Sequence, residues 1–351
     1  MKKNILTFVF GTMATLLTAQ NFEDIAPCGV HLLQPINSSW ESDENLVQSS
    51  FDNTEKVIPV VFHIFHESGF ENVSRENILL ALERLNKDFN KNHENLPQTP
   101  TVFSNIAADI DVQFVLATKD PQGNCTDGIN RYFTDLTALQ LQNSLNLSQF
   151  LWDDNRYLNV FVSRTLASGN TLSLGYGVFP GFNPPYGNAI FLSHEVMLFS
   201  EQGIYADESI THEVGHWLDL RHVWGDTGGN VHNCGDTDGI TDTPNQLGPS
   251  RKCFQDFPFI TCNNGPNGNM FCNFMDYGSK GCLTMFTNGQ KNRMQTILNF
   301  TSDRKNLWTP VNLDSTGANA WTPAFSCPAT PEADFALDKP YFIYCEPNIE
   351  V

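Results

Sequence analysis

Residues 211–222 read Thr-His-Glu-Val-Gly-His-Trp-Leu-Asp-Leu-Arg-His, and this stretch decides the fold. His212 and His216 are four residues apart, so on a helix both imidazoles leave from one face and can reach one Zn²⁺ at roughly 2.0–2.1 Å. Glu213 lies at the flank of that face, where it can hold a water without becoming a ligand. His222 comes six residues after His216, so the chain must turn between them. Three neutral imidazoles leave a fourth position open, as a catalytic zinc requires.

The alternative for this stretch is a helix whose two histidines are satisfied structurally. His222 weighs against that alternative, and so does a second motif, Asn273-Phe274-Met275-Asp276-Tyr277, which resembles the Met-turn beneath the metal in metzincin peptidases. Together with Val223-Trp224-Gly225-Asp226 and Asp242-Thr243-Pro244, these motifs resemble the pappalysin family of metzincins, and within it the small secreted members of the ulilysin and mirolysin kind. The resemblance extends from about Val57 to about Phe300.

The hydrophobic pattern upstream of the motif predicts buried strands and one long helix. Val57–His66 is a β-branched and aromatic run typical of a buried strand, and we interpret His63 and His66 within it as structural. Ser74 is a suitable N-cap for a helix that extends to about Asn90 with one apolar face. Further strands are expected within residues 110–117, 158–162, 175–180 and 188–192. The resemblance implies an α+β metzincin-like peptidase, with a twisted, mostly antiparallel-edged sheet, a backing helix and the zinc helix in its upper half, and an irregular, disulfide-linked lower half.

Asp207 or Ser209 is expected to cap the zinc helix, with Glu208 in its first turn, where a negative charge is favourable.

Composition and the start of the chain indicate an exported protein. The 351 residues carry a formal net charge of −19, which argues against nucleic acid or an anionic membrane as a partner. Lys2-Lys3 followed by the apolar run Ile5–Leu17 is typical of a secretory signal peptide over residues 1–20. This run is shorter than the ~20 residues that span a bilayer, and no later segment is long and apolar enough to do so. We therefore expect a secreted protein without a membrane span.

The chain contains nine cysteines, which in an exported protein argue for disulfides, and the odd number leaves at least one thiol unpaired. Cys28 stands apart in residues 21–55, a segment without sustained periodicity that we expect to be a propeptide. One hypothesis is a cysteine switch, in which the Cys28 thiolate occupies the fourth zinc position and keeps the zymogen inactive. The alternative is a disulfide, for example with Cys125. Pappalysin-like proenzymes carry such a Cys-Gly near their start, which favours the switch and its release by cleavage near Glu55-Lys56.

The stretch after the zinc helix is rich in cysteine, glycine and acidic residues. The resemblance implies the crossed disulfides Cys234–Cys262 and Cys253–Cys282, and it leaves Cys272 without an assigned partner. Alternating acidic and small oxygen-bearing residues suit Ca²⁺, although an acidic turn whose side chains cap their own backbone has the same pattern. Pappalysin-like enzymes bind structural calcium here, so the resemblance favours a calcium site. Its candidate ligands are Asp236, Asp238, Asp242 and Thr243.

The motifs predict a zinc endopeptidase that acts on protein or peptide substrates and is inhibited by its own propeptide. Glu213 would take a proton from a zinc-bound water as this attacks the peptide carbonyl, and would pass the proton to the leaving amine. Tyr277 matches the position whose phenol helps stabilise the tetrahedral intermediate in several metzincins, and the alternative for it is a core aromatic. Met275 is expected to pack beneath the site without a bond to zinc.

Two positions depart from the family pattern. Asp219 stands where metzincins have the glycine that ends the zinc helix, and Asp tolerates a left-handed conformation at a strain of about 1–3 kcal/mol. Lys280 stands where ulilysin-like enzymes have an Asp, to which their preference for Arg or Lys just after the scissile bond is attributed. A lysine there repels basic side chains and favours acidic or neutral ones. The alternative is that Lys280 points to solvent beside a merely apolar pocket.

The predicted domain organisation follows from these features. Residues 56–308 form the catalytic domain, and residues 309–351 form a linker that contains Trp and Pro, followed by the start of a PKD-like β-sandwich or a truncated form of one. A second functional hypothesis is a secreted binding or adhesion module with weak or no catalysis on the same scaffold. The intact histidines and Glu213 argue against it. A monomer is the default expectation.

Overall fold

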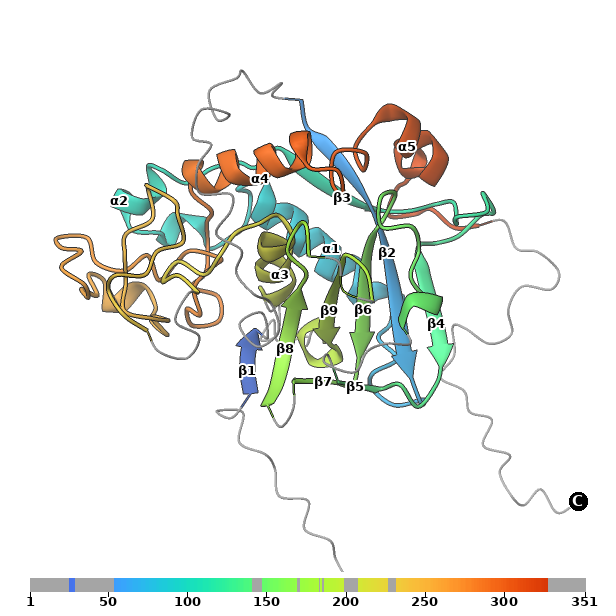
Figure 1. The fold of residues 1–351 in the computed structure, drawn as a ribbon, viewed down its shortest axis with the longest axis horizontal. Coiled ribbons are helices and arrows are strands. Elements are labelled where there is room, and N and C mark those ends of the chain that lie inside the picture. The colour runs from blue at the N-terminus through green and yellow to red at the C-terminus, as the bar shows by residue number, and fades with distance from the viewer. Residues whose placement is uncertain are drawn as a thin grey trace, which may run out of the picture.

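A computed structural model describes residues 25–28, 54–140, 147–168, 171–182, 184, 186–198, 208–226 and 232–327. The strands lie on one side of the molecule and the long loops that follow helix α3 lie on the other (Figure 1). The predicted signal peptide at residues 1–20 lies outside the described residues, as do most of the predicted propeptide, Asp207 and residues 328–351.

Strand β2 (Lys56–His66) is the spine of the sheet. Its β-branched and aromatic run is buried from Ile58 to Phe65, as the sequence predicts for a strand covered on both faces. It pairs in parallel with β3 (Val112–Leu116) along its first half and with β4 (Ile129–Phe133) along its second half. Its other edge pairs in parallel with β6 (Leu158–Ser163).

The remaining strands make the sheet mixed. The order is β3-β2-β6-β9-β8-β7-β5, and β1 pairs in parallel with the outer edge of β8 (Figure 1). Antiparallel pairing occurs where β8 meets β9 and β7, and the other pairs are parallel. The predicted metzincin-like α+β class is confirmed, with antiparallel pairing concentrated at β8. The bounds are β1 (Ile25–Cys28), β5 (Ala138–Gln140), β7 (Thr165–Ser168), β8 (Thr171–Gly177) and β9 (Ala189–Ser193).

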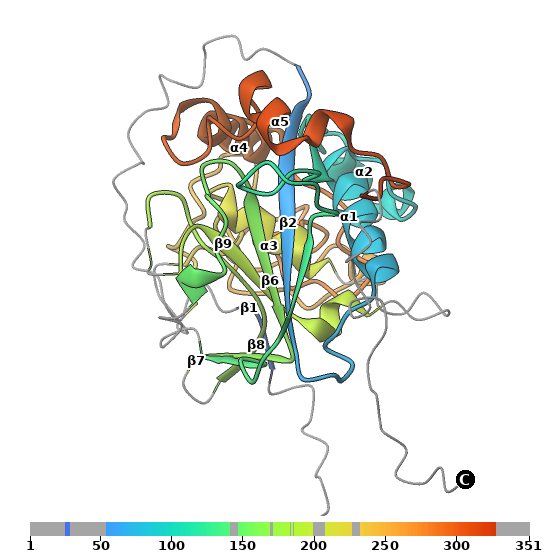
Figure 2. The same cartoon turned by 90° about the vertical axis from the view of Figure 1, so that its right-hand side faces the viewer.

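Helix α1 (Arg75–Phe89) begins and ends where its sequence predicts. The Ser74 side chain accepts from the backbone N–H of Asn77 at 3.1 Å, and Asn90 follows the last turn. Ile78, Leu82 and other apolar residues on one face join the side chains of β2 and β6 in the main core. Figure 2 shows α1 beside the sheet. Among the described residues, no helix has the length and apolar character needed to cross a bilayer.

Helix α3 (Ser209–Trp217) is the predicted zinc helix, but its start differs from the prediction. Ser209 is the first helical residue and Glu208 occupies the N-cap, without a side-chain capping hydrogen bond. The Glu208 carboxylate instead accepts from the Arg84 guanidinium of α1 at 3.1 Å. An unpaired buried carboxylate destabilises a protein more than a missing N-cap hydrogen bond does, so the ion pair with Arg84 is the more favourable arrangement for Glu208.

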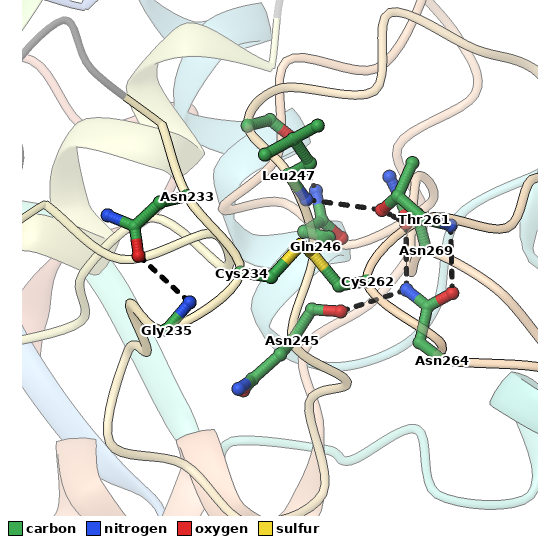
Figure 3. Close-up of a disulfide and its surroundings, with 11 residues drawn as sticks. Asn233, Cys234, Gly235, Asn245, Gln246, Leu247, Thr261, Cys262, Asn264 and Asn269 are labelled. Carbon is green, nitrogen blue, oxygen red and sulfur yellow. Dashed lines mark hydrogen bonds between the residues drawn. A yellow bond between two sulfur atoms is a disulfide. The ribbon is translucent and has the colours of Figure 1, made fainter.

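The lower half, between residues 223 and 287, contains little regular structure among its described residues. The disulfides Cys234–Cys262 and Cys253–Cys282 cross-link it, and these are the pairs that the resemblance implies. Figure 3 shows the first of them beside a set of asparagine side chains. A segment with few apolar residues cannot form a hydrophobic core of its own. Disulfides and hydrogen bonds therefore hold the shape of the lower half. The short elements of the chain are η5 (Leu96–Gln98), α2 (Thr101–Ser104), η7 (Leu147–Gln149), η8 (His194–Met197) and η9 (Phe254–Asp256).

The lower half ends at helix α4 (Asn288–Phe300), which begins with a capping box between Thr287 and Gln290.

The segment after Trp308 is folded onto the sheet, so the predicted linker is wrong for residues 309–327. Helix α5 (Pro310–Thr316) is followed by η10 (Ala318–Ala320), and Thr316 O accepts from two backbone N–H groups that follow β3 at 3.0 Å. Cys327 forms a disulfide with Cys125. Proline suggested a linker, but here it occupies the first helical position, where its missing N–H costs nothing. The predicted PKD-like start lies outside the described residues.

Candidate metal centre and active site

Helix α3 can approach the sheet closely because β8 has a glycine opposite it. A Cβ at Gly175 would lie 2.5 Å from Glu213 Oε1 and 2.7 Å from Glu213 Cγ, so any larger residue would displace this side chain. The backbone of Gly175 pairs with β9 on one edge and with Cys28 of β1 on the other. The glycine therefore lets a buried carboxylate lie directly against β8.

Helix α3 ends in a turn that redirects the chain toward its own histidines. Asp219 adopts the left-handed conformation, with φ of 73°, as its position in the family pattern predicts. The N–H of Leu220 donates to Gly215 O and the N–H of Asp219 donates to His216 O, both at 2.9 Å, which is the Schellman pattern. The Asp219 carboxylate forms an ion pair with Arg293 of α4, a contact that a glycine would lack.

The turn brings His222 back to His212 and His216. The Nε2 atom of His216 lies 3.1 Å from that of His212 and 3.3 Å from that of His222. Ligands about 2.0–2.1 Å from a tetrahedral zinc lie roughly 3.3–3.4 Å apart, so the spacing fits this ion.

Hydrogen bonds fix the tautomer of each ring. His212 Nδ1 and His216 Nδ1 donate to the backbone carbonyls of Phe274 and Leu220, both at 2.7 Å, and His222 Nδ1 donates to Asp226. With Nδ1 protonated, the Nε2 lone pairs face one another, an arrangement that a bound cation stabilises. The donor set and its outer partners therefore fit zinc.

Burial keeps the His212 imidazole neutral. All three imidazoles are buried, and burial, followed by the charge on His222, lowers the pKa of His212 to about 3. A neutral imidazole is the form that binds zinc, so burial prepares the site.

Asp226 orients His222, a role that the sequence analysis did not assign. Its carboxylate accepts from both the ring Nδ1 and the backbone N–H of His222, and Trp224 stacks on the same ring with centroids 4.3 Å apart. The charge on His222, followed by the hydrogen bonds from its ring and its backbone N–H, holds the pKa of Asp226 below its usual range, although burial alone would raise it. The sequence does contain a signal for this role, because Asp226 lies four residues after the candidate ligand His222 and a carboxylate commonly orients a metal-binding histidine.

The Cys28 thiol completes the cluster. Its sulfur and one nitrogen of each histidine all lie within 4.8 Å of one another, and all four residues are buried. In the described part of the chain no other group of three or more His, Cys, Asp or Glu residues gathers its ligand atoms in this way. The thiol also donates to Glu213 Oε2 at 3.5 Å. The alternative disulfide between Cys28 and Cys125 is wrong, because Cys125 pairs with Cys327.

The Met-turn lies beneath the cluster. A Cβ at Gly215 of α3 would lie 2.3 Å from the Met275 sulfur, so the methionine packs directly against the helix backbone between the two helical histidines. Met275 is completely buried. This contact is the packing role that the sequence predicts for it.

Tyr277 belongs to the cluster and not only to the core. Its ring centroid lies 5.6 Å from that of His212 and 5.0 Å from that of His222. Burial, followed by the charges on Cys28 and Glu213, raises the pKa of its phenol well above the usual value. The hydroxyl therefore remains a hydrogen-bond donor. By contrast His63 bonds to Asn159 at 2.9 Å inside the sheet, and neither it nor His66 reaches the cluster.

A pocket of 330 Å³ adjoins His212. Lys280, in the loop after the Met-turn, lines this pocket together with a second cation, Arg251, which the sequence analysis did not single out. The apolar wall comes from Leu174 of β8 and from Leu283. The pocket therefore lies between β8, the start of α3 and the loop that follows the Met-turn.

The acidic loop does not gather its four candidate ligands into one site. Asp242 accepts from Thr287 Oγ1 at 2.6 Å and from Gly289 N–H at 2.8 Å, so it is occupied at the start of α4. Thr243 Oγ1 donates to both oxygens of Asp238, and burial raises the pKa of Asp238 to about 7. Asp236 and Asp238 are buried and remain the candidates of this set.

Comparisons with known proteins identify the family to which this geometry belongs. Residues 142–299 match the family model of peptidase family M43 described as pregnancy-associated plasma protein-A. A structure of mature mirolysin from Tannerella forsythia with a cleaved peptide is 33% identical, has a TM-score of 0.67, and the match covers 75% of this chain and 98% of that one. The chain belongs to the pappalysin family.

Two further relatives extend the comparison. A promirolysin variant from Tannerella forsythia is 33% identical with a TM-score of 0.69, and the match covers 77% of this chain and 89% of that one. An extracellular metalloprotease of Arthroderma gypseum is 27% identical over 281 residues, which are 75% of this chain and 80% of the relative. This pappalysin is thus a secreted metallopeptidase, and its family implies zinc.

Proposed function

We propose that this pappalysin is a zinc endopeptidase that is made as a cysteine-switch zymogen. The observation that carries the proposal is the convergence of His212, His216 and His222. The Nε2 atom of His216 lies 3.1 Å from that of His212 and 3.3 Å from that of His222, and Glu213 Oε2 accepts from the Cys28 thiol of the same cluster. These histidines would hold the ion. When bound, zinc polarises the scissile carbonyl and activates the attacking water.

The side chains of this protein supply the proton transfers. Glu213 accepts a proton from the attacking water and then donates it to the amine of the leaving product, so that one carboxylate serves both halves of the reaction. Tyr277, whose raised pKa keeps its phenol protonated, donates a hydrogen bond to the developing oxyanion. The outer edge of β8 offers backbone groups with which an extended peptide can pair.

Replacing Glu213 tests the catalytic assignment. Glu213→Ala should retain one zinc per chain, because the carboxylate is not a ligand, and should lose casein cleavage by a factor of about 10² to 10⁴. The measurements are zinc content by atomic absorption and casein digestion before and after removal of the propeptide. An alanine variant that still digests casein at the wild-type rate would contradict the mechanism. The complete ligand set gives the binding-module hypothesis no support.

The zymogen part of the proposal rests on β1. Cys28 lies beside the three histidines, and its strand occupies the edge of β8 that a substrate would need. We propose that residues 1–20 are a signal peptide and residues 21–55 a propeptide. Cleavage near Glu55-Lys56, where the first catalytic strand begins, would then release both the thiol and the strand.

The Cys28→Ser variant tests this part. Serine keeps the shape of the side chain but replaces the soft sulfur ligand, so the uncleaved variant should digest a peptide at least about tenfold faster than the uncleaved wild type. Cys272→Ala is the matched control, because Cys272 is the other cysteine of the described chain that forms no disulfide, and it lies outside the cluster. Equal latency in Cys28→Ser and wild type would count against the switch.

Two finer proposals concern specificity and calcium. Lys280 lines the pocket beside His212 in place of an acid, so we propose that the enzyme does not prefer a basic residue after the scissile bond. Asp236 and Asp238 would bind Ca²⁺ together with backbone carbonyls and water. A thermal melt that is unchanged by a calcium-selective chelator, with zinc retained, would count against the calcium site.

A further inference from the structure

The pocket beside His212 has two cations on neighbouring segments. The backbone N–H of Arg251 donates to Tyr277 O at 3.1 Å, and the N–H of Ser279 donates to Lys252 O at 3.0 Å. These two hydrogen bonds tie the loop that carries Arg251 to the loop that carries Lys280. Both side chains are exposed and line the same pocket.

The two acidic residues of the pocket are already occupied. Asp276 is buried and accepts from Ser250 N–H at 2.8 Å, Ser250 Oγ at 2.6 Å and Gln246 Nε2 at 2.8 Å. Glu208 is paired with Arg84 at 3.1 Å. Within the described part of the chain no carboxylate forms an ion pair with Arg251. The lining therefore offers the Arg251 guanidinium to a ligand.

Arg251 stands on a rigid support. Ser250 Oγ, which bonds to Asp276, also accepts from Asn269 Nδ2 at 3.2 Å. Asn264 joins Asn269 Oδ1 to the backbone carbonyl of Asn245, at 2.8 and 2.9 Å (Figure 3). These amides lie next to the Cys234–Cys262 disulfide (Figure 3). A largely buried network of hydrogen bonds of this kind fixes the backbone on which a binding side chain stands.

We infer that the pocket binds the carboxylate of an aspartate or glutamate that directly follows the scissile bond, and that Arg251 is the residue that determines this specificity. The inference rests on the proposed function. Guanidinium binds carboxylate through two parallel hydrogen bonds, which an ammonium does not do, so Arg251 is the main contact and Lys280 adds charge. Leu174 and Leu283 contact the methylene groups of the same side chain.

The test uses three peptides that differ only at the residue after the scissile bond, which is Glu, Gln or Lys. Propeptide-free enzyme should cleave the Glu peptide with a kcat/KM about tenfold or more above that of the isosteric Gln peptide, and the Lys peptide should be the poorest. Arg251→Ala and the larger Arg251→Gln should both bring the Glu to Gln ratio close to one.

Lys252→Ala is the matched control, because Lys252 follows Arg251 directly but places its ammonium over the Phe259 ring, 5.0 Å from the centroid, outside the pocket. It should keep the ratio.

A binding measurement separates this inference from the proposed function. In the Glu213→Ala background, calorimetry should show tighter binding of the uncleaved Glu peptide than of the Gln peptide, and this difference should vanish with Arg251→Gln. Equal cleavage of the Glu and Gln peptides, or a ratio that survives in both Arg251 variants, would overturn the inference alone. A preference for Lys would overturn the inference together with the proposal that the enzyme does not prefer a basic residue after the scissile bond. A protein that binds no zinc and cleaves no peptide would overturn the proposed function, and the inference with it.

Discussion

Gly175 shows how much one absent methyl group decides in this site. Its backbone is part of β8, and the space that a Cβ would fill is occupied by the Glu213 carboxylate. The same side chain has to remain close to the open position of the histidine cluster in order to accept a proton. Packing inside a protein is dense enough that even one additional carbon is felt.

At this scale we predict the effect of Gly175→Ala. The new Cβ, 2.5 Å from Glu213 Oε1, should displace the carboxylate and lower kcat by about tenfold or more, while the three histidines keep zinc. Zinc content and peptide cleavage measure the two effects. Gly265→Ala is the control, since its Cβ would meet only Ile260 at 3.5 Å. Unchanged kcat in Gly175→Ala would show that Glu213 tolerates the shift.

At the scale of elements, a charged network joins the backing helix to the zinc helix. Asp88 of α1 accepts from Thr211 Oγ1 of α3 at 2.7 Å and from Arg84 Nε at 2.8 Å, and Arg84 also reaches Glu208. Burial raises the pKa of Asp88 to about 6, although Arg84 opposes this effect. The network fixes the helix one residue before His212, the first of the proposed zinc ligands.

Arg84→Met should therefore destabilise the fold in a pH-dependent way. It leaves two buried carboxylates without their cation and should lower the free energy of unfolding by about 3–5 kcal/mol at pH 8. The pKa of Asp88 is raised above its value of 3.8 for an unfolded chain, so the folded state takes up a proton as pH falls through 6 and gains stability relative to the unfolded state. Loss of Arg84 raises that pKa further, so the deficit should shrink between pH 8 and pH 6.

Urea denaturation at both pH values measures this change. Lys87→Met on the same helix is the matched control, because Lys87 pairs with the exposed Glu83 and Glu94 and should cost less than about 1 kcal/mol. A deficit in Arg84→Met that does not change with pH would argue against Asp88 as its source.

At the scale of the whole molecule, the C-terminal segment closes the domain. Residues 309–327 return along the sheet, and Arg75 donates to Phe325 O at 3.0 Å. Just before this segment, the Lys56 ammonium lies over the Trp308 ring, 4.8 Å from the ring centroid. The Cys125–Cys327 disulfide fixes the end of this segment across 202 residues of sequence. The start and the end of the described catalytic domain are thus held together.

The Cys125→Ser/Cys327→Ser double variant should lose about 2–5 kcal/mol of stability, because the unfolded chain regains the freedom that the long loop had removed. Guanidinium denaturation of the zinc-loaded protein gives this value. A chain that ends at Trp308, the predicted domain border, should lose more, since it also removes the cover of β2 that α5 provides. A midpoint that both changes leave unaltered would mean that the segment does not stabilise the domain.

The sequence by itself determined the elements whose pattern is local. The spacing of His212 and His216, the apolar run of β2 and the capped, one-faced helix α1 each depend on neighbours within a few residues, so periodicity and capping predicted them. The spacing also gave His222 as the third ligand, and the resemblance to the pappalysins added the disulfide pairs and the left-handed turn at Asp219. Each of these is part of a motif that can be read from the sequence.

Only the tertiary structure decided the contacts between distant segments. Cys28 meets the histidines because β1 pairs with β8, and Arg251 joins Lys280 because their loops exchange backbone hydrogen bonds. Gly175 and the folded segment at residues 309–327 have no local sequence pattern that indicates their roles. Such contacts depend on the packing of the whole chain, where residues far apart in sequence become neighbours, and local propensity carries no information about which pairs these will be.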